Sequence, residues 1–210
     1  MPPSEIRAVR TETELREIVQ EPPQPIWDKD IGRIDEHART IIAHSPLVLL
    51  ATSTPEGTYD VSPRGDPAGS VLVLSDHRLV LADRPGNHRV DSFRNVLHNP
   101  HVGMLFLVPG MNETLRVNGR ATLVSDAPFF DDLMVRGKKP RLAILVDVEE
   151  LYMHCGKAFL RSSLWNPETW PDRKSLPTLG QIAKDHLDLK EQSAEQIDTA
   201  LDQDYELNQY

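Results

Sequence analysis

The segment Asp83–Arg89 combines turn-forming, helix-capping and basic residues within seven positions. It lies between an apolar run and a stretch with helical spacing, so the backbone is expected to pass here from a strand into a helix. Gly86 permits a tight turn, and Asn87 is a good N-cap. Free backbone N–H groups at a helix start attract anions, and His88 and Arg89 add side-chain donors. Two interpretations stay open: a phosphate-binding cradle, or a capped helix with solvated basic residues.

Two further segments carry polar residues at positions that suit a ligand. Ser62–Pro67 is expected to end a strand in a rigid turn. Such a turn either presents backbone N–H groups and Arg64 to a planar heterocycle or phosphate, or is an ordinary surface turn. Glu113–Arg120 alternates in polarity as a half-buried strand does, with Arg116 on its polar face. That face either meets a ligand or a partner subunit, or is simply solvated.

The single cysteine, Cys155, precedes a basic segment. His154 is its neighbour on an expected strand, and adjacent strand residues point to opposite faces, which argues against a thiol–imidazole pair. Lys157 and Arg161 share a helix face near Trp165, where they either hold an anionic or aromatic substrate or are solvated. The only His-x-x-His pattern contains a proline, so no metal site is expected. No residue is singled out as a general acid or base, so the catalytic residues are unknown.

Short apolar or alternating runs, separated by turn residues, predict seven strands that are mostly linked as hairpins. The expected strands are 47–51, 58–62, 71–74, 78–82, 102–108, 115–124 and 142–153. Helical spacing of apolar residues predicts helices at 11–20, 30–44, 87–98 and 127–134. Many short strands with few helices indicate a mainly β (α+β) fold built on an antiparallel sheet.

The composition limits the possible partners and location. The chain has 210 residues, with 23 Lys+Arg against 32 Asp+Glu and a formal net charge of −9. An acidic chain is a poor match for nucleic acid, no apolar run is long enough for a membrane span, and the N-terminus lacks a secretory apolar region. One cysteine allows no intramolecular disulfide, so a reducing, cytoplasmic location is expected. We expect an N-terminal helical extension over 1–44, a binding domain over 45–165, and a C-terminal helical extension with an acidic tail over 166–210.

Taken in order, these stretches resemble the pyridoxamine 5′-phosphate oxidase-like superfamily of FMN-binding split barrels. The matching stretches are 49–53 with the hairpin to 62–66, then 79–89, 91–107 and 113–119. The segment from His154 to Trp165 resembles the C-terminal part of an uncharacterised subgroup. The oxidase itself differs, because it has a basic-apolar segment ending in Lys in place of 62–66 and an Arg-x-His motif that this chain lacks in its C-terminal part.

The resemblance implies a six-stranded antiparallel split β-barrel with flanking helices, which works as a homodimer with FMN at the subunit interface. The implied FMN-binding residues come from both subunits. They are Ser62, Arg64, Gly65, Asp66, Ala82, Asp83, Asn87, His88 and Arg89, with Thr114 and Arg116 reaching in from the partner subunit. Three basic or aromatic residues are substrate-site candidates: Lys157, Arg161 and Trp165.

The implied activity is that of an FMN-dependent oxidoreductase acting on a small molecule. One alternative is a non-redox protein that binds, stores or senses flavin, haem or another cofactor, and a second is a structural homodimer with an empty cleft. His88 stands at an implied phosphate position. Because a neutral imidazole binds phosphate less well than a charged one, FMN affinity is expected to fall from about pH 6 to about pH 8.

Overall fold

The computed structural model describes residues 6–210, which belong to two compact units, Met1–Ile31 and Gly32–Tyr210. In the first unit, helix α1 spans Glu12–Ile18 and helix α2 spans Gln24–Trp27. Neither helix buries a residue. The apolar face predicted for the first helix is therefore present in the sequence but exposed in the structure.

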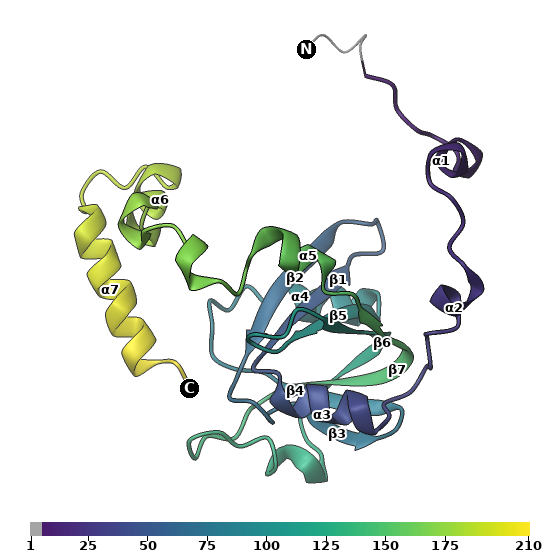
Figure 1. Ribbon diagram of the computed structural model, residues 1–210. Coiled ribbons are helices and arrows are strands. Elements are labelled where there is room, and N and C mark those ends of the chain that lie inside the picture. The colour runs from purple at the N-terminus through teal and green to yellow at the C-terminus, as the bar shows by residue number, and fades with distance from the viewer. Residues whose placement is uncertain (1–5) are drawn as a thin grey trace. The chain divides into compact units, whose positions relative to one another are not determined.

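The second unit is built on one antiparallel sheet of seven strands, in the order β2-β1-β5-β6-β7-β4-β3 (Figure 1). The strands are β1 Leu47–Ser53, β2 Tyr59–Gly65, β3 Leu72–Ser75, β4 Arg78–Ala82, β5 His101–Leu107, β6 Thr114–Val124 and β7 Ala143–His154. All seven strands predicted from the apolar runs are confirmed. The six-stranded count implied by the resemblance is wrong, because the short β3 pairs with β4 and extends the sheet. The antiparallel sheet with flanking helices is consistent with a split barrel.

The core lies where alternating side chains of the strands meet two helices. In β1 and in the first half of β6, buried side chains alternate with more exposed ones, as expected when one sheet face covers the core. Helix α3 (Glu36–His44) contributes Ala38 and Ile42 to this core, and helix α4 (Asp91–His98) contributes Phe93 and Val96. Helix α4 thereby packs against β1, β2 and β6, which places its first turn beside the edge strand β2.

The helices begin at different residues from those that the spacing predicts. Helix α3 spans Glu36–His44 and does not begin at residue 30, because the Asp35 side chain caps it by accepting a hydrogen bond from the Ala38 N–H at 2.8 Å. Helix α4 spans Asp91–His98. The predicted helix 127–134 is reduced to a single 3₁₀ turn. The remaining elements are α5 Lys157–Ser162, α6 Leu179–His186 and α7 Ala194–Leu207, with 3₁₀ turns at Pro128–Phe130, Pro167–Thr169 and Arg173–Ser175.

Candidate functional site

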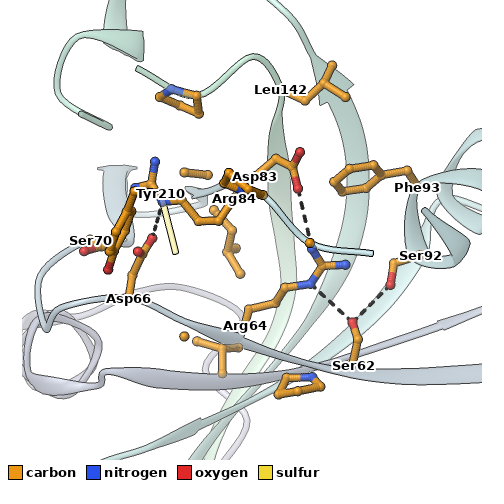
Figure 2. A pocket seen from close by; sticks show the side chains of 18 of the residues that line it. Ser62, Arg64, Asp66, Ser70, Asp83, Arg84, Ser92, Phe93, Leu142 and Tyr210 are labelled. Atoms are coloured by element: carbon orange, nitrogen blue, oxygen red, sulfur yellow. Dashed lines mark hydrogen bonds and ion pairs between the residues drawn. The ribbon is translucent and has the colours of Figure 1, made fainter. Parts of the chain in front are cut away.

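A pocket of about 1250 Å³ opens between strand β2, the loop after β4 and the start of α4 (Figure 2). Its wall also includes residues 138–142 and, on one side, Gln209 and Tyr210. Nine residues singled out from the sequence line it: Ser62, Arg64, Gly65, Asp66, Ala82, Asp83, Asn87, His88 and Arg89. The structure therefore brings two of the segments identified from the sequence together at one cavity.

Strand β2 directs polar side chains into the pocket because it is an edge strand whose side chains alternate between two faces. Asp60, Ser62 and Arg64 lie on the partly buried face. Tyr59 and Val61, the two neighbours of Asp60, are 77% and 62% exposed on the other face. Over residues 59–62 the alternation of the strand thus separates the pocket side of β2 from its outer side.

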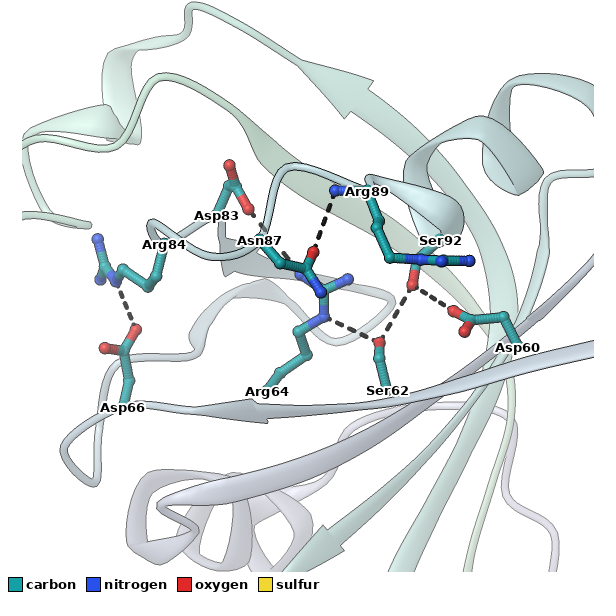
Figure 3. Close-up of polar contacts among 9 residues, drawn as sticks. All are labelled: Asp60, Ser62, Arg64, Asp66, Asp83, Arg84, Asn87, Arg89 and Ser92. Atoms are coloured by element: carbon teal, nitrogen blue, oxygen red, sulfur yellow. Dashed lines mark hydrogen bonds and ion pairs between the residues drawn. The ribbon is translucent and has the colours of Figure 1, made fainter. Parts of the chain in front are cut away.

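Two serines connect β2 to α4 through a chain of hydrogen bonds (Figure 3). The buried Ser92, in the first turn of α4, donates from its Oγ to Asp60 Oδ2 at 2.7 Å. Its Oγ also lies 3.1 Å from the Oγ of Ser62, which accepts a hydrogen bond from Arg64 Nε at 3.2 Å. This chain fixes the guanidinium of Arg64 at the pocket wall. Asp60 and Ser92 were not singled out from the sequence, because only the fold pairs them.

The guanidinium of Arg64 is held between an aromatic ring and a carboxylate. Its Cζ lies 5.3 Å from the ring centroid of Phe93, and its Nη1 lies 3.9 Å from Asp83 Oδ1. Burial lowers the pKa of Arg64, while the nearby charges of Asp83 and Asp60 act in the opposite direction. Burial likewise raises the pKa of Asp83, against the effect of Arg64. Both groups are thus partly shielded from water, which strengthens charge–charge contacts at this wall.

The loop before α4 leaves backbone donors free. Helix α4 has no side-chain cap, and the residue before it, Val90, has a φ of 53° in the left-handed region. His88 also lies there, with a φ of 58°. Among residues 6–210, the backbone N–H groups of Gly86, Asn87 and His88 find no protein acceptor. Free N–H groups beside an uncapped helix start give this end of the pocket a partial positive charge.

Two expectations about this loop are wrong. Asn87 does not cap the helix; its Oδ1 accepts a hydrogen bond from the Arg89 N–H at 3.0 Å, and α4 begins only at Asp91. Gly86 is not in the left-handed region either, so the turn makes no use of its conformational freedom. Arg89 Nε donates to Asp91 Oδ2 at 2.8 Å, so this exposed guanidinium already has a carboxylate partner.

An ion pair that sequence reasoning missed lies on the opposite side of the pocket. Arg84 Nε donates to Asp66 Oδ2 at 2.7 Å, and the two side chains are only 14% and 15% exposed. Arg84 Nη2 also donates to the backbone oxygen of Leu133 at 2.9 Å. Asp66 was expected at the site, but nothing in the spacing of the two segments shows that these residues pair.

The pocket is net cationic, although the whole chain has a charge of −9. Its lining has six Lys and Arg residues, Arg64, Arg84, Arg89, Lys138, Lys139 and Arg141, against four Asp residues, Asp60, Asp66, Asp83 and Asp91. The last three cations come from the loop before β7 and were not predicted. The run Arg-Gly-Lys-Lys-Pro-Arg at 136–141 was the pattern available to find them. A cationic pocket in an anionic chain favours an anionic ligand.

Five expected site residues lie outside this pocket. Thr114 is buried at the start of β6, with Arg116 on the same strand. Lys157 and Arg161 are exposed on α5, and Trp165 donates from its Nε1 to a backbone oxygen at 2.8 Å. The approach of Thr114 and Arg116 from a partner subunit stays a prediction, as does the substrate role of the other three.

The side chains of the described residues, 6–210, do not gather as metal ligands do. In this part of the chain, no group of three or more His, Cys, Asp or Glu side chains could hold a metal ion. None of its helices has both the length and the apolar character needed to cross a membrane. Cys155 is a free, exposed thiol.

The chain matches a known protein family. The family model described as pyridoxamine 5′-phosphate oxidase matches residues 34–155, more than half of the chain. No curated protein gives a significant match. HupZ from Group A Streptococcus is similar in structure, with 16% identity and a TM-score of 0.46 over 56% of this chain and 91% of that one. An FMN-binding protein from Syntrophomonas wolfei has 13% identity and a TM-score of 0.45, over 68% and 93% of the two chains. HutZ, a haem storage protein from Vibrio cholerae, has 13% identity and a TM-score of 0.40, over 58% and 94%.

Proposed function

The chain belongs to the pyridoxamine 5′-phosphate oxidase family, and from that premise we propose that its pocket binds FMN and that it is an FMN-dependent oxidoreductase for a small substrate. The observation that carries the proposal is the net cationic pocket, with free backbone N–H groups at one end, in a chain of net charge −9. Its volume of about 1250 Å³ exceeds the roughly 300–1,000 Å³ of ordinary ligand pockets, which leaves room for a substrate beside a cofactor.

The loop before α4 fits the phosphate of FMN. Backbone donors of Gly86, Asn87 and His88 are unused by the protein, and an uncapped helix start stabilises negative charge. Arg89 adds a guanidinium, which would have to share itself between Asp91 and the phosphate. These groups would bind the phosphate mainly through the backbone, with side-chain charge as a supplement.

The wall formed by β2 would border the flavin ring. FMN supplies hydride-transfer chemistry when bound, and the protein supplies position and electrostatics. Arg64, fixed by Ser62 and Phe93, would place a positive charge beside the ring and so favour its reduced, anionic form. Asp83, whose pKa is raised by burial, is the carboxyl group at this wall best suited to hold or release a proton.

We further propose that the functional unit is a homodimer. In that arrangement Thr114 and Arg116 would reach the flavin from the second copy, because neither lines the pocket of its own chain. Lys157, Arg161 and Trp165 would then be placed near the substrate by the same second copy.

A binding protein without redox turnover is the second candidate. Three of the four pocket aspartates already accept hydrogen bonds from protein groups: Asp60 from Ser92, Asp66 from Arg84, and Asp91 from Arg89. That leaves few groups for acid–base chemistry and suits storage or sensing of a cofactor. Haem is the less suitable ligand, because His88 is the only imidazole of the pocket lining among the described residues.

The test is purification without added cofactor, followed by an absorption spectrum before and after soaking with FMN and desalting. Retained flavin absorption supports FMN binding. Bleaching of that absorption when a nicotinamide donor is added supports redox turnover over storage. A colourless protein that releases all FMN contradicts the proposal, and a haem spectrum replaces it with the alternative.

Riboflavin, which lacks the phosphate, is the matched control ligand. If the loop before α4 grips the phosphate, riboflavin should bind at least about tenfold more weakly than FMN, since one hydrogen bond to a charged group contributes about 1.5–3 kcal/mol. Equal affinities would remove the phosphate from the role that the loop gives it.

A further inference from the structure

The segment that follows α7 returns to the pocket and places an aromatic ring on its wall. The ring centroid of Tyr210 lies 4.9 Å from Cζ of Arg136 and 6.0 Å from Cζ of Arg84. Gln209 Oε1 accepts a hydrogen bond from Arg136 Nη1 at 3.1 Å, and Lys138 Nζ donates to the backbone oxygen of Tyr210. One end of the cavity is thus walled by residues far along the chain from β2.

The ring lies beside the ion pair between Arg84 and Asp66 (Figure 2). Within the described part of the chain, Asp66 Oδ1 is buried and has no hydrogen-bond partner. A buried carboxylate oxygen without a donor is unfavourable. Access of water or of a ligand with a donor group would relieve this cost, so the closed arrangement is not the most favourable one for Asp66.

The contacts that hold the ring are few and of the kind that open readily. Helix α7 buries no residue, and it is joined to α6 by a hydrogen bond from the Gly180 N–H to Asp198 Oδ1 at 2.7 Å. Tyr210 as a whole is partly exposed. Each ring–guanidinium contact of this kind favours the bound position of the ring over the released one by about two- to fivefold. The ring is therefore held reversibly.

We propose that Tyr210 is a reversible cap over the end of the pocket that Arg84 and Lys138 line, and that it controls the entry and release of the ligand. When the cap is open, Arg84 and Lys138 become accessible to an anion, and when it is closed the ligand is retained. The identity of that ligand as FMN rests on the proposed function, whereas the cap itself rests only on the contacts of Tyr210.

The first test needs no ligand. Arg136 and Lys138 are trypsin sites in the exposed loop that Tyr210 and Gln209 contact. Tyr210→Ala should speed cleavage at Lys138 several-fold, whereas Tyr210→Phe, which keeps the ring, should cleave like the wild type. Tyr205→Ala is the matched control, because Tyr205 is 57% exposed on α7.

The second test is the rate at which FMN dissociates, measured by stopped-flow fluorescence. Tyr210→Ala should raise this rate by about 5- to 30-fold, the product of two ring–guanidinium contacts. Arg136→Gln should raise it in the same direction, although Arg136 does not line the pocket. The double variant should release FMN no faster than Tyr210→Ala, because Arg136 acts through the ring.

The outcomes separate the cap from the cofactor. If FMN fails to bind but Tyr210→Ala still speeds cleavage, the proposed function fails and the cap stands. If neither cleavage nor dissociation distinguishes Tyr210→Ala from Tyr210→Phe, the cap is refuted. Faster dissociation without faster cleavage also refutes it, because Tyr210 would then be a fixed wall contact. Additive rates in the double variant with Arg136→Gln would refute the coupling.

Discussion

Replacing Arg64 with Gln should weaken FMN binding by about 10- to 150-fold. A hydrogen bond to a charged group contributes about 1.5–3 kcal/mol, and each 1.4 kcal/mol is tenfold in affinity. The Arg64 side chain is 25% exposed, so much of its desolvation cost is already met in the folded protein. Its Nε is also fixed by the Ser62 hydroxyl at 3.2 Å, so little orientational freedom remains to be lost on binding. These two features favour the upper half of the range.

Titration of FMN fluorescence measures the affinity of the variant and the wild type. Repeating it at a second salt concentration distinguishes a partly buried charge from a surface one, because the partly buried charge is screened less. Arg39→Gln is the matched control: Arg39 also pairs with an aspartate, Asp76 at 2.7 Å, and it does not line the pocket. The control should leave the affinity unchanged. A shift of less than twofold for Arg64→Gln, in a protein with an unchanged circular dichroism spectrum, would refute the assignment of Arg64 to the cofactor wall.

Three further changes test the site and its frame. Burial raises the pKa of Asp83 above its unfolded value. Its contribution to stability is therefore present below that value and is lost as the pH rises through the folded pKa. Urea unfolding should accordingly show Asp83→Asn gaining stability relative to the wild type as the pH rises above the ordinary Asp pKa of about 3.9. Val90→Gly should raise the melting temperature by about 2–4 °C. The left-handed φ of 53° costs a residue with a side chain about 1–2 kcal/mol, and the greater conformational entropy that Gly loses on folding offsets part of the gain. Gly119→Ala should lower it by roughly 3–10 °C, because its Cβ would overlap a backbone carbonyl of β7, whereas Gly86→Ala, with open space around it, should not.

The strands and the pocket segments could be predicted because their patterns are local. Runs of apolar residues such as 47–51 and the alternation of β6 depend only on which face of a strand is buried. The same holds for the segment Asp83–Arg89, in which turn and basic residues are adjacent in sequence. The proximity of segments 62–66 and 83–89 followed only from the family resemblance, because nothing in either segment indicates which other segment it contacts.

The ion pair of Arg84 with Asp66 and the hydrogen bond of Ser92 to Asp60 could not be predicted, because each joins residues 18 or 32 positions apart across the pocket. The predicted start of α4 at Asn87 is also wrong. Asn87 has the chemistry of a cap, yet its side chain is used by the Arg89 N–H within the loop. Local propensity identifies residues able to cap a helix, and a competing hydrogen bond within the loop prevents Asn87 from doing so here.

The conformation of the loop before α4 follows from those distant contacts. His88 and Val90 both adopt left-handed φ values, although a β-branched residue such as Val90 disfavours that region. The loop is fixed before this point by the pair of Arg84 with Asp66 and after it by the hydrogen bond from Ser92 to Asp60, and both carboxylates belong to β2 or the turn after it. Strain of this kind persists only where surrounding structure imposes it, and it concentrates at ligand sites. The free N–H groups that suit a phosphate are therefore held in place by β2, so the anion site can form only when the β1–β2 hairpin has joined the sheet.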